Sequence, residues 1–285
     1  MPAWKLRGTT LPLDRPIGAG IVNVTTDSMW EGARSGSAAQ AVADGLALAE
    51  GGFDMLDVGA VPARSGPAVP PHEEAARLVP AVERLGVLAG VPVSADTFEP
   101  EVAAAAVAAG AHAVNDIGGG TDAMLEVVGD SGAGYVLMHI EGPPRADRPT
   151  PEYQDVVDRL KSFFAERIER AIELGVEEEA IVVDPGLDFD KSVDDDLEIL
   201  RRIGELRTLG RPVYLSLSRK DFLGAVLAGS WEGRREASER GDATAAAAAL
   251  VVGEGVEILR LHDARSLDAI RISHAIRSAG PAVTI

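Results

Sequence analysis

The sequence contains no cysteine, so disulfides, thiolate nucleophiles and cysteine-based zinc sites are excluded. Aromatic residues make up only 4% of the chain, and a large core must therefore be aliphatic, as buried parallel strands and their covering helices require. No apolar run approaches the roughly 20 residues of a membrane helix. The first ten residues carry Lys5 and Arg7 but no apolar segment typical of a signal peptide. We therefore expect a soluble cytoplasmic protein with no membrane partner.

Positive charge is also scarce. The chain has 27 Lys and Arg against 45 Asp and Glu, which gives a formal net charge of −18. Such a surface repels phosphate backbones, so we expect no nucleic-acid partner. The acidity itself is expected to serve solubility. An anionic small ligand would need a local cluster of basic side chains.

One unit recurs along the chain: a helical stretch ends in glycine, and a short apolar run follows and finishes in a polar residue. Gly52 precedes FDMLDVG, and Gly110 precedes AHAVNDI. The eight predicted strands lie near Gly18–Val24, Phe53–Gly59, Val91–Asp96, His112–Ile117, Tyr135–His139, Ala180–Asp184, Pro212–Leu217 and Glu257–His262. The predicted helices lie near Ser37–Glu50, His72–Leu88, Glu99–Ala109, Asp122–Asp130, Glu152–Leu174, Asp194–Leu209, Lys220–Ala228, Asp242–Gly253 and Ser266–Ser278.

This alternation predicts an α/β fold, a single (β/α)8 TIM barrel, for which 285 residues is a usual length. An open, doubly wound sheet is the alternative, and it is disfavoured because no Gly-x-Gly-x-x-Gly follows the first strand. We expect the barrel to span residues 18–280. Residues 1–17 are expected to form an extension, a small hairpin at the bottom of the barrel.

Every predicted strand ends in a polar residue at the edge where barrel active sites are built. These residues are Asn23, Asp57, Asp96, Asn115, His139, Asp184, Ser218 and His262. Any one of them alone reads as a strand-end cap. Together they indicate a polar ligand site, because burying several carboxylates without partners is costly.

The charges suggest an anionic ligand. Arg260 and His262 share one face of the last strand, and Arg219 and Lys220 open a helix, whose N-terminus attracts anions. Each also has a structural reading, as a salt bridge or a cap. Many barrels bind phosphate near strands seven and eight, so we expect a phosphorylated ligand.

Asp96, Asn115 and Asp184 supply acceptors that suit a planar heterocycle with several N–H donors. A metal hydrolase would be the competing interpretation, given His139 and His262. Its usual motifs are missing, since the first strand ends in Asn rather than His-x-His and no His-Glu-x-x-His occurs, so zinc is not expected.

The motifs GIVNVTTDS, MLDVG, VSADT, AVNDIGGG, LMHIEGPPR, VVDPGLDFDK, LSLSRKDFLG and LRLHD span Gly20 to Asp263. In this order they resemble the dihydropteroate synthase family and the wider group of pterin-binding barrels. The resemblance implies a homodimeric transferase of folate biosynthesis. Such an enzyme condenses 6-hydroxymethyl-7,8-dihydropterin pyrophosphate with p-aminobenzoate to give 7,8-dihydropteroate and pyrophosphate.

The resemblance also implies roles for individual residues. The pterin would be held by Asp96, Asn115, Asp184 and Lys220. The pyrophosphate would be held by Asn23, Arg260 and His262, with Mg²⁺ at Asn23, since Mg²⁺ relies on waters and substrate phosphates. Met138, Phe189 and Asp221 would contact substrate, and Lys220, Arg64 and Asp96 would act in catalysis. Pyrophosphate would leave first, and the amine would trap a delocalised pterin cation without a covalent nucleophile.

The chain departs from the family pattern around the expected aminobenzoate site. The segment Gly59–Gly66 keeps only Arg64 and the flanking glycines of the usual Gly-Gly-Glu-Ser-Thr-Arg-Pro-Gly, with Ala63 and Ser65 among the changes. Thr26 and Met29 replace the usual Pro and Phe. Asp221 replaces a Ser that faces the p-aminobenzoate carboxylate, so repulsion predicts weak p-aminobenzoate use and weak sulfonamide inhibition. The alternative is that Asp221 only caps its helix.

Three rival functions stay open at this point. One is a pterin-binding barrel with another acceptor or little synthase activity. Another is a corrinoid-linked methyltetrahydrofolate methyltransferase, which the presence of Lys220, Arg260 and His262 disfavours because that chemistry has no pyrophosphate. The last is a non-catalytic pterin-binding protein.

Overall fold

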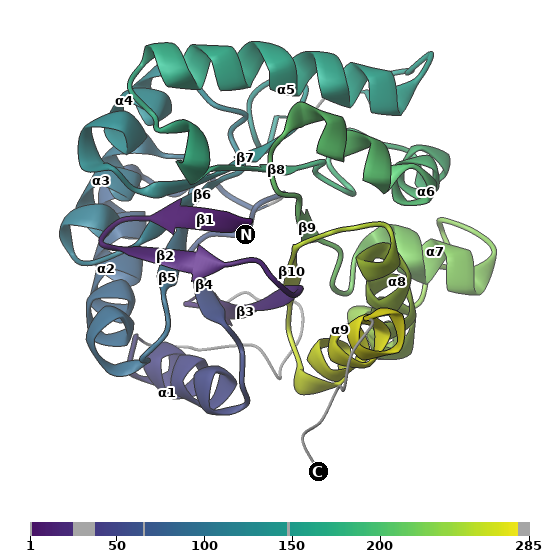
Figure 1. Cartoon of the computed structure of the whole chain (residues 1–285), viewed down its shortest axis with the longest axis horizontal. Coiled ribbons are helices and arrows are strands. Elements are labelled where there is room, and N and C mark those ends of the chain that lie inside the picture. The colour runs from purple at the N-terminus through teal and green to yellow at the C-terminus, as the bar shows by residue number, and fades with distance from the viewer. Residues whose placement is uncertain (1, 25–37, 65, 147–148, 279–285) are drawn as a thin grey trace.

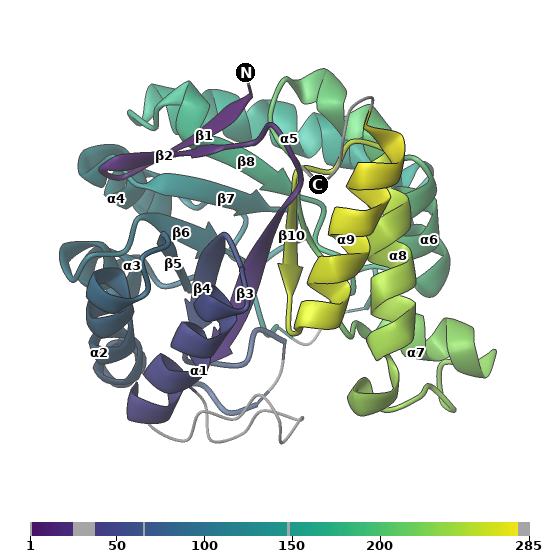
Figure 2. The same ribbon diagram turned by 60° about the horizontal axis from the view of Figure 1, so that its bottom comes forward.

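Eight parallel strands form a closed barrel surrounded by helices (Figures 1 and 2). The computed structural model describes residues 2–24, 38–64, 66–146 and 149–278. The sheet order is β8-β7-β6-β5-β4-β3-β10-β9, and a bridge between Val183 and Val213 joins its two ends. The strands are β3 (Ile17–Asn23), β4 (Met55–Gly59), β5 (Val93–Asp96), β6 (Ala113–Asp116), β7 (Gly134–Met138), β8 (Ile181–Asp184), β9 (Tyr214–Ser216) and β10 (Ile258–Leu261). The predicted TIM barrel is confirmed.

The helices follow the predicted pattern with two local differences. They are α1 (Ala38–Glu50), α2 (Pro71–Leu88), α3 (Pro100–Ala108), α4 (Asp122–Ser131), α5 (Val156–Glu173), α6 (Val193–Arg201), α7 (Asp221–Ala228), α8 (Gly241–Gly253) and α9 (Ala264–Arg277). Helix α5 begins later than predicted, because Asp155 caps it by accepting from the Asp158 amide. The predicted helix 194–209 divides at Arg202, which leaves helical geometry (φ −116°), and a 3-10 helix follows over Ile203–Leu209.

A hairpin made by β1 (Ala3–Leu6) and β2 (Thr9–Pro12) crosses the N-terminal end of the barrel (Figure 1). Trp4 and Leu6 are buried there against the inward residues of the strands, such as Met55 and Tyr214. The indole N–H of Trp4 donates to the carbonyl of Ala180 over 2.7 Å. This end of the barrel is filled with side chains, so a ligand can enter only at the opposite end.

Because side chains alternate between the two sides of a strand, charged groups lie inside the barrel at its C-terminal end. In β10, Leu259 and Leu261 face the outer core against the helices, while Ile258 and Arg260 alternate with them and face the interior. The same alternation places Met55 below Asp57 in β4, Ala113 below Asn115 in β6, and Val182 below Asp184 in β8. None of the helices in the described part of the chain combines the length and the apolar character needed to cross a bilayer.

Candidate active site

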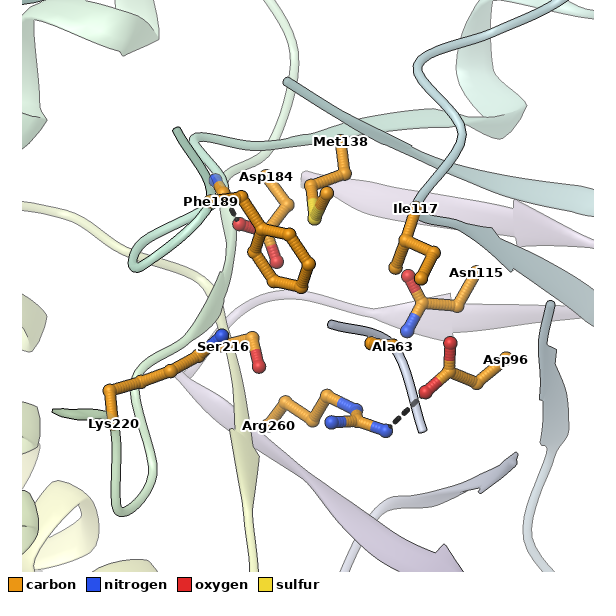
Figure 3. Close-up of a pocket in the computed structure, with 11 residues that line it drawn as sticks. Ala63, Asp96, Asn115, Ile117, Met138, Asp184, Phe189, Ser216, Lys220 and Arg260 are labelled. Carbon is orange, nitrogen blue, oxygen red and sulfur yellow. Dashed lines mark hydrogen bonds and ion pairs between the residues drawn. The ribbon is translucent and has the colours of Figure 1, made fainter. Parts of the chain in front are cut away.

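A cavity opens at the C-terminal ends of the strands (Figure 3). It is lined by Ala63, Asp96, Asn115, Ile117, Met138, Asp184, Gly186, Phe189, Ser216, Lys220 and Arg260. Residues of β5 to β10 and of the loops after β4, β6, β8 and β9 thus meet at one site. The structure brings together these residues predicted from the sequence: Asp96, Asn115, Met138, Asp184, Phe189, Lys220 and Arg260.

The cavity has an apolar side and a polar rim. Ile117, Met138 and Phe189 belong to one small apolar cluster, and Figure 3 shows Phe189 and Met138 across the cavity from Arg260. The carboxylates and the amide surround this apolar surface. A flat heterocycle can stack on such a surface while its edge meets the acceptors.

Asp184 ends β8 and is almost fully buried. Its Oδ1 accepts a hydrogen bond from the Gly186 amide over 2.7 Å, and Figure 3 shows the carboxylate turned toward the cavity. Burial raises the pKa of Asp184 above its usual range. Gly186 has φ +68°, and a Cβ there would lie 2.3 Å from the carbonyl oxygen of His139, so only glycine allows this turn.

Arg260 lies between two carboxylates on the floor of the cavity. Its Nε donates to Asp57 over 2.5 Å and its Nη2 to Asp96 over 2.6 Å. Asp57 is fully buried and also accepts from Ser94 and from the side-chain amide of Asn115. Because Asn115 donates its Nδ2 to Asp57, its Oδ1 remains as an acceptor for a ligand. The sequence analysis placed Asp57 among the polar residues at the strand ends but gave it no individual role, because its partner Arg260 lies far away in the chain.

The charge of Asp96 depends on this network. Burial raises the pKa of Asp96 to about 7, while the positive charge of Arg260 opposes the rise. Burial alone would lower the pKa of Arg260, but Asp57 and Asp96 together raise it above its ordinary value. Arg260 therefore stays charged and fixes the positions of both carboxylates.

Lys220 reaches the cavity from the N-cap position of α7. Its Nζ lies 4.5 Å from the centroid of the Phe189 ring, a cation–π geometry. Loss of water contact lowers the pKa of Lys220. Its neighbour Arg219 turns away and pairs with Asp263 over 2.7 Å, so it does not add to the anion site that we expected there.

His262 does not supply the positive charge expected from the sequence. Its Nδ1 lies 2.9 Å from the Ser218 hydroxyl. Burial, with the charges of Arg260 and Arg219, lowers the pKa of His262 to about 3. The ring is therefore neutral at physiological pH and can contribute only hydrogen bonds.

His139 also departs from the expected arrangement, because its ring faces away from the cavity that Met138 lines. It is fully buried, 3.0 Å from Lys191 Nζ, and it packs edge-on against Phe163. Burial lowers the pKa of His139 to about 2. The sequence analysis was wrong to place His139 at the ligand site. Successive side chains of a strand face opposite sides, so His139 points away from the cavity that Met138 lines.

A second cavity adjoins the first, and Ala63 and Phe189 line both. It is lined by Ala63, Arg64, Ile140, Arg145, Ala146, Thr150, Asp188, Phe189, Asp190, Lys191 and Trp231, and we call it the outer cavity. Arg64 thus lies outside the first cavity. Its guanidinium lies 3.0 Å from Asp221 and 3.3 Å from Asp188.

The structure does not support the repulsive role that the sequence suggested for the Asp221 carboxylate. Its carboxylate pairs with Arg240 over 2.7 Å, with Arg64, and with Arg234 over 3.6 Å. Burial alone would raise the pKa of Asp221, but these arginines outweigh burial and lower it. The carboxylate is therefore ionised and its charge is compensated, so it is not the uncompensated repulsive group that we expected.

The alternative role for Asp221, as a helix cap, is wrong. Lys220 is the N-cap of α7 and Asp221 is the first helical residue. The amides of Asp221 and Phe222 instead donate to the carboxylate of Asp188, over 2.6 and 3.1 Å. The sequence analysis missed Asp188, because the partners of its carboxylate lie more than 30 residues away.

Asn23 ends β3 beside Gly59 of β4 and is partly buried. Within the described residues, no three or more His, Asp or Glu side chains form a group that could hold a metal ion. A metal at Asn23 would therefore depend on oxygens brought by a ligand. Thr26, Met29 and Ser65 lie outside the described residues.

Known proteins match this chain over nearly its whole length. The family model described as "Pterin binding enzyme" matches residues 19–262. A dihydropteroate synthase of Mycobacterium leprae is 37% identical over 93% of this chain and 94% of that protein. A second protein of that organism, named "Inactive dihydropteroate synthase 2", is 38% identical over 90% of this chain and 89% of that protein.

Solved structures agree in fold. The dihydropteroate synthase of Xanthomonas albilineans with 4-aminobenzoic acid has a TM-score of 0.88 and 39% identity, covering 98% of this chain and 99% of that chain. The same protein has been solved in complex with 7,8-dihydropteroate.

The barrel and the acceptor-lined cavity, together with these matches, define the class: the chain belongs to the pterin-binding enzyme family. Within this family its function is that of a dihydropteroate synthase, a transferase of folate biosynthesis.

Removing the buried carboxylate beside Arg260 should destabilise the fold. Asp57→Ala leaves Arg260 short of one partner in a site with little water, and we expect a loss of about 3 kcal/mol in the free energy of unfolding. Urea unfolding measures this.

The matched control is Asp122→Ala, which breaks an ion pair of similar length, 2.6 Å, with Arg170 on the surface. Solvent screens that pair, so its loss should cost much less. Equal costs for the two variants would contradict the structural importance of Asp57.

Proposed function

We propose that this chain joins 6-hydroxymethyl-7,8-dihydropterin pyrophosphate to the amine of p-aminobenzoate, releasing pyrophosphate. The observation that carries the proposal is the first cavity, in which the acceptors of Asp96, Asn115 and Asp184 surround an apolar surface next to two cations. Support comes from the Xanthomonas albilineans enzyme, whose structures contain 4-aminobenzoic acid and 7,8-dihydropteroate.

The pterin would stack on Phe189 and Met138 and turn its N–H edge toward Asp184 and Asn115 Oδ1. The C–O bond to pyrophosphate breaks with the electron pair leaving on oxygen, and the pterin methylene becomes a delocalised cation. The carboxylates around the ring oppose this positive charge. The aromatic amine then forms the C–N bond and loses a proton.

The pyrophosphate would lie beside Asn23, Arg260 and His262. Arg260 carries the charge, and neutral His262 offers a hydrogen bond. Mg²⁺ fits Asn23 only as a single amide-oxygen ligand, with the rest of its shell from water and the pyrophosphate, an arrangement that Mg²⁺ often adopts. When bound, the ion would neutralise charge on the leaving group.

Asp184→Asn tests the pterin site. The amide can accept from Gly186 only by turning its NH₂ toward the ring's donors, so we expect pterin binding to weaken by about 2 kcal/mol or more, roughly 30-fold, with the fold intact. Calorimetry with pterin pyrophosphate and urea unfolding measure the two quantities. Near-normal affinity in the folded variant would exclude this orientation of the pterin.

The wild-type and Asp184→Asn proteins also test the transfer reaction itself. The wild-type chain should release pyrophosphate much faster when p-aminobenzoate is added than without it, and Asp184→Asn should abolish the release. Because one relative is named as inactive, binding without release is an informative result: it would favour a non-catalytic pterin-binding protein instead.

Asn23→Ala tests the metal position. Mg²⁺ should strengthen the binding of pterin pyrophosphate to the wild-type chain, because an ion held at Asn23 would neutralise part of the charge of the pyrophosphate. The variant should lose most of this gain, while free pterin binds equally to both proteins. Calorimetry with and without Mg²⁺ gives these affinities, and an unchanged gain would remove Asn23 from the metal site.

We further propose a homodimer formed through α8 and α9, which lie side by side on one flank of the barrel (Figure 2). An apolar groove between them is lined by Ala245, Ala249 and Ile272 among others, and Ile276 is 79% exposed at its edge. Such a continuous apolar surface is typical of an interface between subunits.

Ile276→Asp should convert a dimer to a monomer, because it places a charge in the apolar contact. Sedimentation velocity measures the change. The control is Val87→Asp, at an equally exposed apolar position on α2, and it should leave the dimer intact. A monomeric wild-type chain would contradict the proposal.

A further inference from the structure

We propose that Asp188 determines acceptor specificity: its carboxylate occupies the positive groups beside the pterin cavity and weakens the binding of an acceptor that carries a carboxylate. The inference rests on the proposed function, because it concerns the acceptor of that reaction. No neutral acceptor of the same shape would meet this competition.

The first step is the position of the acceptor. The outer cavity shares Ala63 and Phe189 with the pterin cavity, so a molecule in the outer cavity can present an amine to the end of the pterin. Arg64 and the N-terminus of α7 are the positive groups nearest Asp188 on this side, and Arg145 and Lys191 also line the outer cavity. A carboxylate on the acceptor would be attracted to these groups.

The carboxylate of Asp188 already binds Arg64 and the N-terminus of α7. Its Oδ2 accepts the Asp221 amide over 2.6 Å and lies 3.3 Å from Arg64 Nη1, and its Oδ1 accepts the Phe222 amide over 3.1 Å. The side chain is 1% exposed. An incoming carboxylate must therefore compete with an internal one that is held in place and already desolvated.

The backbone fixes Asp188 in this position. Its φ is +65°, in the left-handed region that Asp and Asn tolerate better than other non-glycine residues. Its amide donates to both carboxylate oxygens of buried Asp196 over 3.1 Å. These bonds hold the carboxylate against the start of α7.

The remaining charges support the same conclusion. Arg64, Arg234 and Arg240 face Asp221, and Arg64 also faces Asp188, so three positive charges meet two negative ones. Removing the charge of Asp188 would make this cluster of five side chains more positive by one charge. Asp221 would keep Arg234 and Arg240 as partners, while Arg64 and the start of α7 would become available to the acceptor.

The test compares a charged and a neutral acceptor. Calorimetry gives the Kd of p-aminobenzoate and of the neutral analogue p-aminobenzamide for the wild type, Asp188→Asn and Asp188→Gly. Both substitutions tolerate positive φ. We expect p-aminobenzoate to bind about tenfold tighter to both variants, as for one charge-assisted interaction, while p-aminobenzamide is unchanged.

The matched control is Asp194→Asn, which removes the same charge from the exposed first turn of α6. It should change neither Kd. Equal changes for the two acceptors in the Asp188 variants, or weaker p-aminobenzoate binding, would overturn the proposal and leave Asp188 as a helix cap alone.

The two Kd values test the role of Asp188 even if the chain does not turn over substrate. If the wild-type chain releases no pyrophosphate, the proposed function fails, while the ratio of the two Kd values still tests Asp188. If turnover is normal and the ratio does not move, only the role of Asp188 fails.

Discussion

The burial of Arg260 between Asp57 and Asp96 is the constraint on which the site depends. The three residues come from β10, β4 and β5, and none of these charges could be buried alone without a large desolvation penalty. Their mutual pairing therefore ties the arrangement of these three strands to the shape of the cavity. It also turns the Asn115 amide, so that an acceptor faces the ligand.

The first cavity and the outer cavity differ in how far their charged and polar groups are paired within the protein. In the first cavity, where we propose that the pterin binds, Asp184 and Asn115 keep acceptors directed at the ligand space. At the outer cavity, Asp188 and Asp221 already pair with Arg64. This internal pairing links three loops and stabilises the start of α7, and it leaves less positive charge for an anionic substrate than the number of arginines suggests.

Strand periodicity was enough to predict much of the site. A polar residue at the end of an apolar run marks the C-terminal edge, and this rule found Asp96, Asn115 and Asp184. The same rule failed for His139, because it ignores which side of the strand the last residue faces. It also could not give the charge of His262, since the pKa of that ring depends on Arg219 and Arg260 and on burial.

The sequence by itself determined the barrel, its eight strands, the family and many of the residues that line the first cavity, because these follow from local periodicity and from motifs in a fixed order. The tertiary structure alone decided the roles of Asp57 and Asp188 and the compensation of Asp221. Each depends on partners from distant parts of the chain, such as Arg260 for Asp57 and Arg64 for Asp188. Ion pairing and burial depend on which residues are close in space, and this cannot be deduced from their separation along the chain.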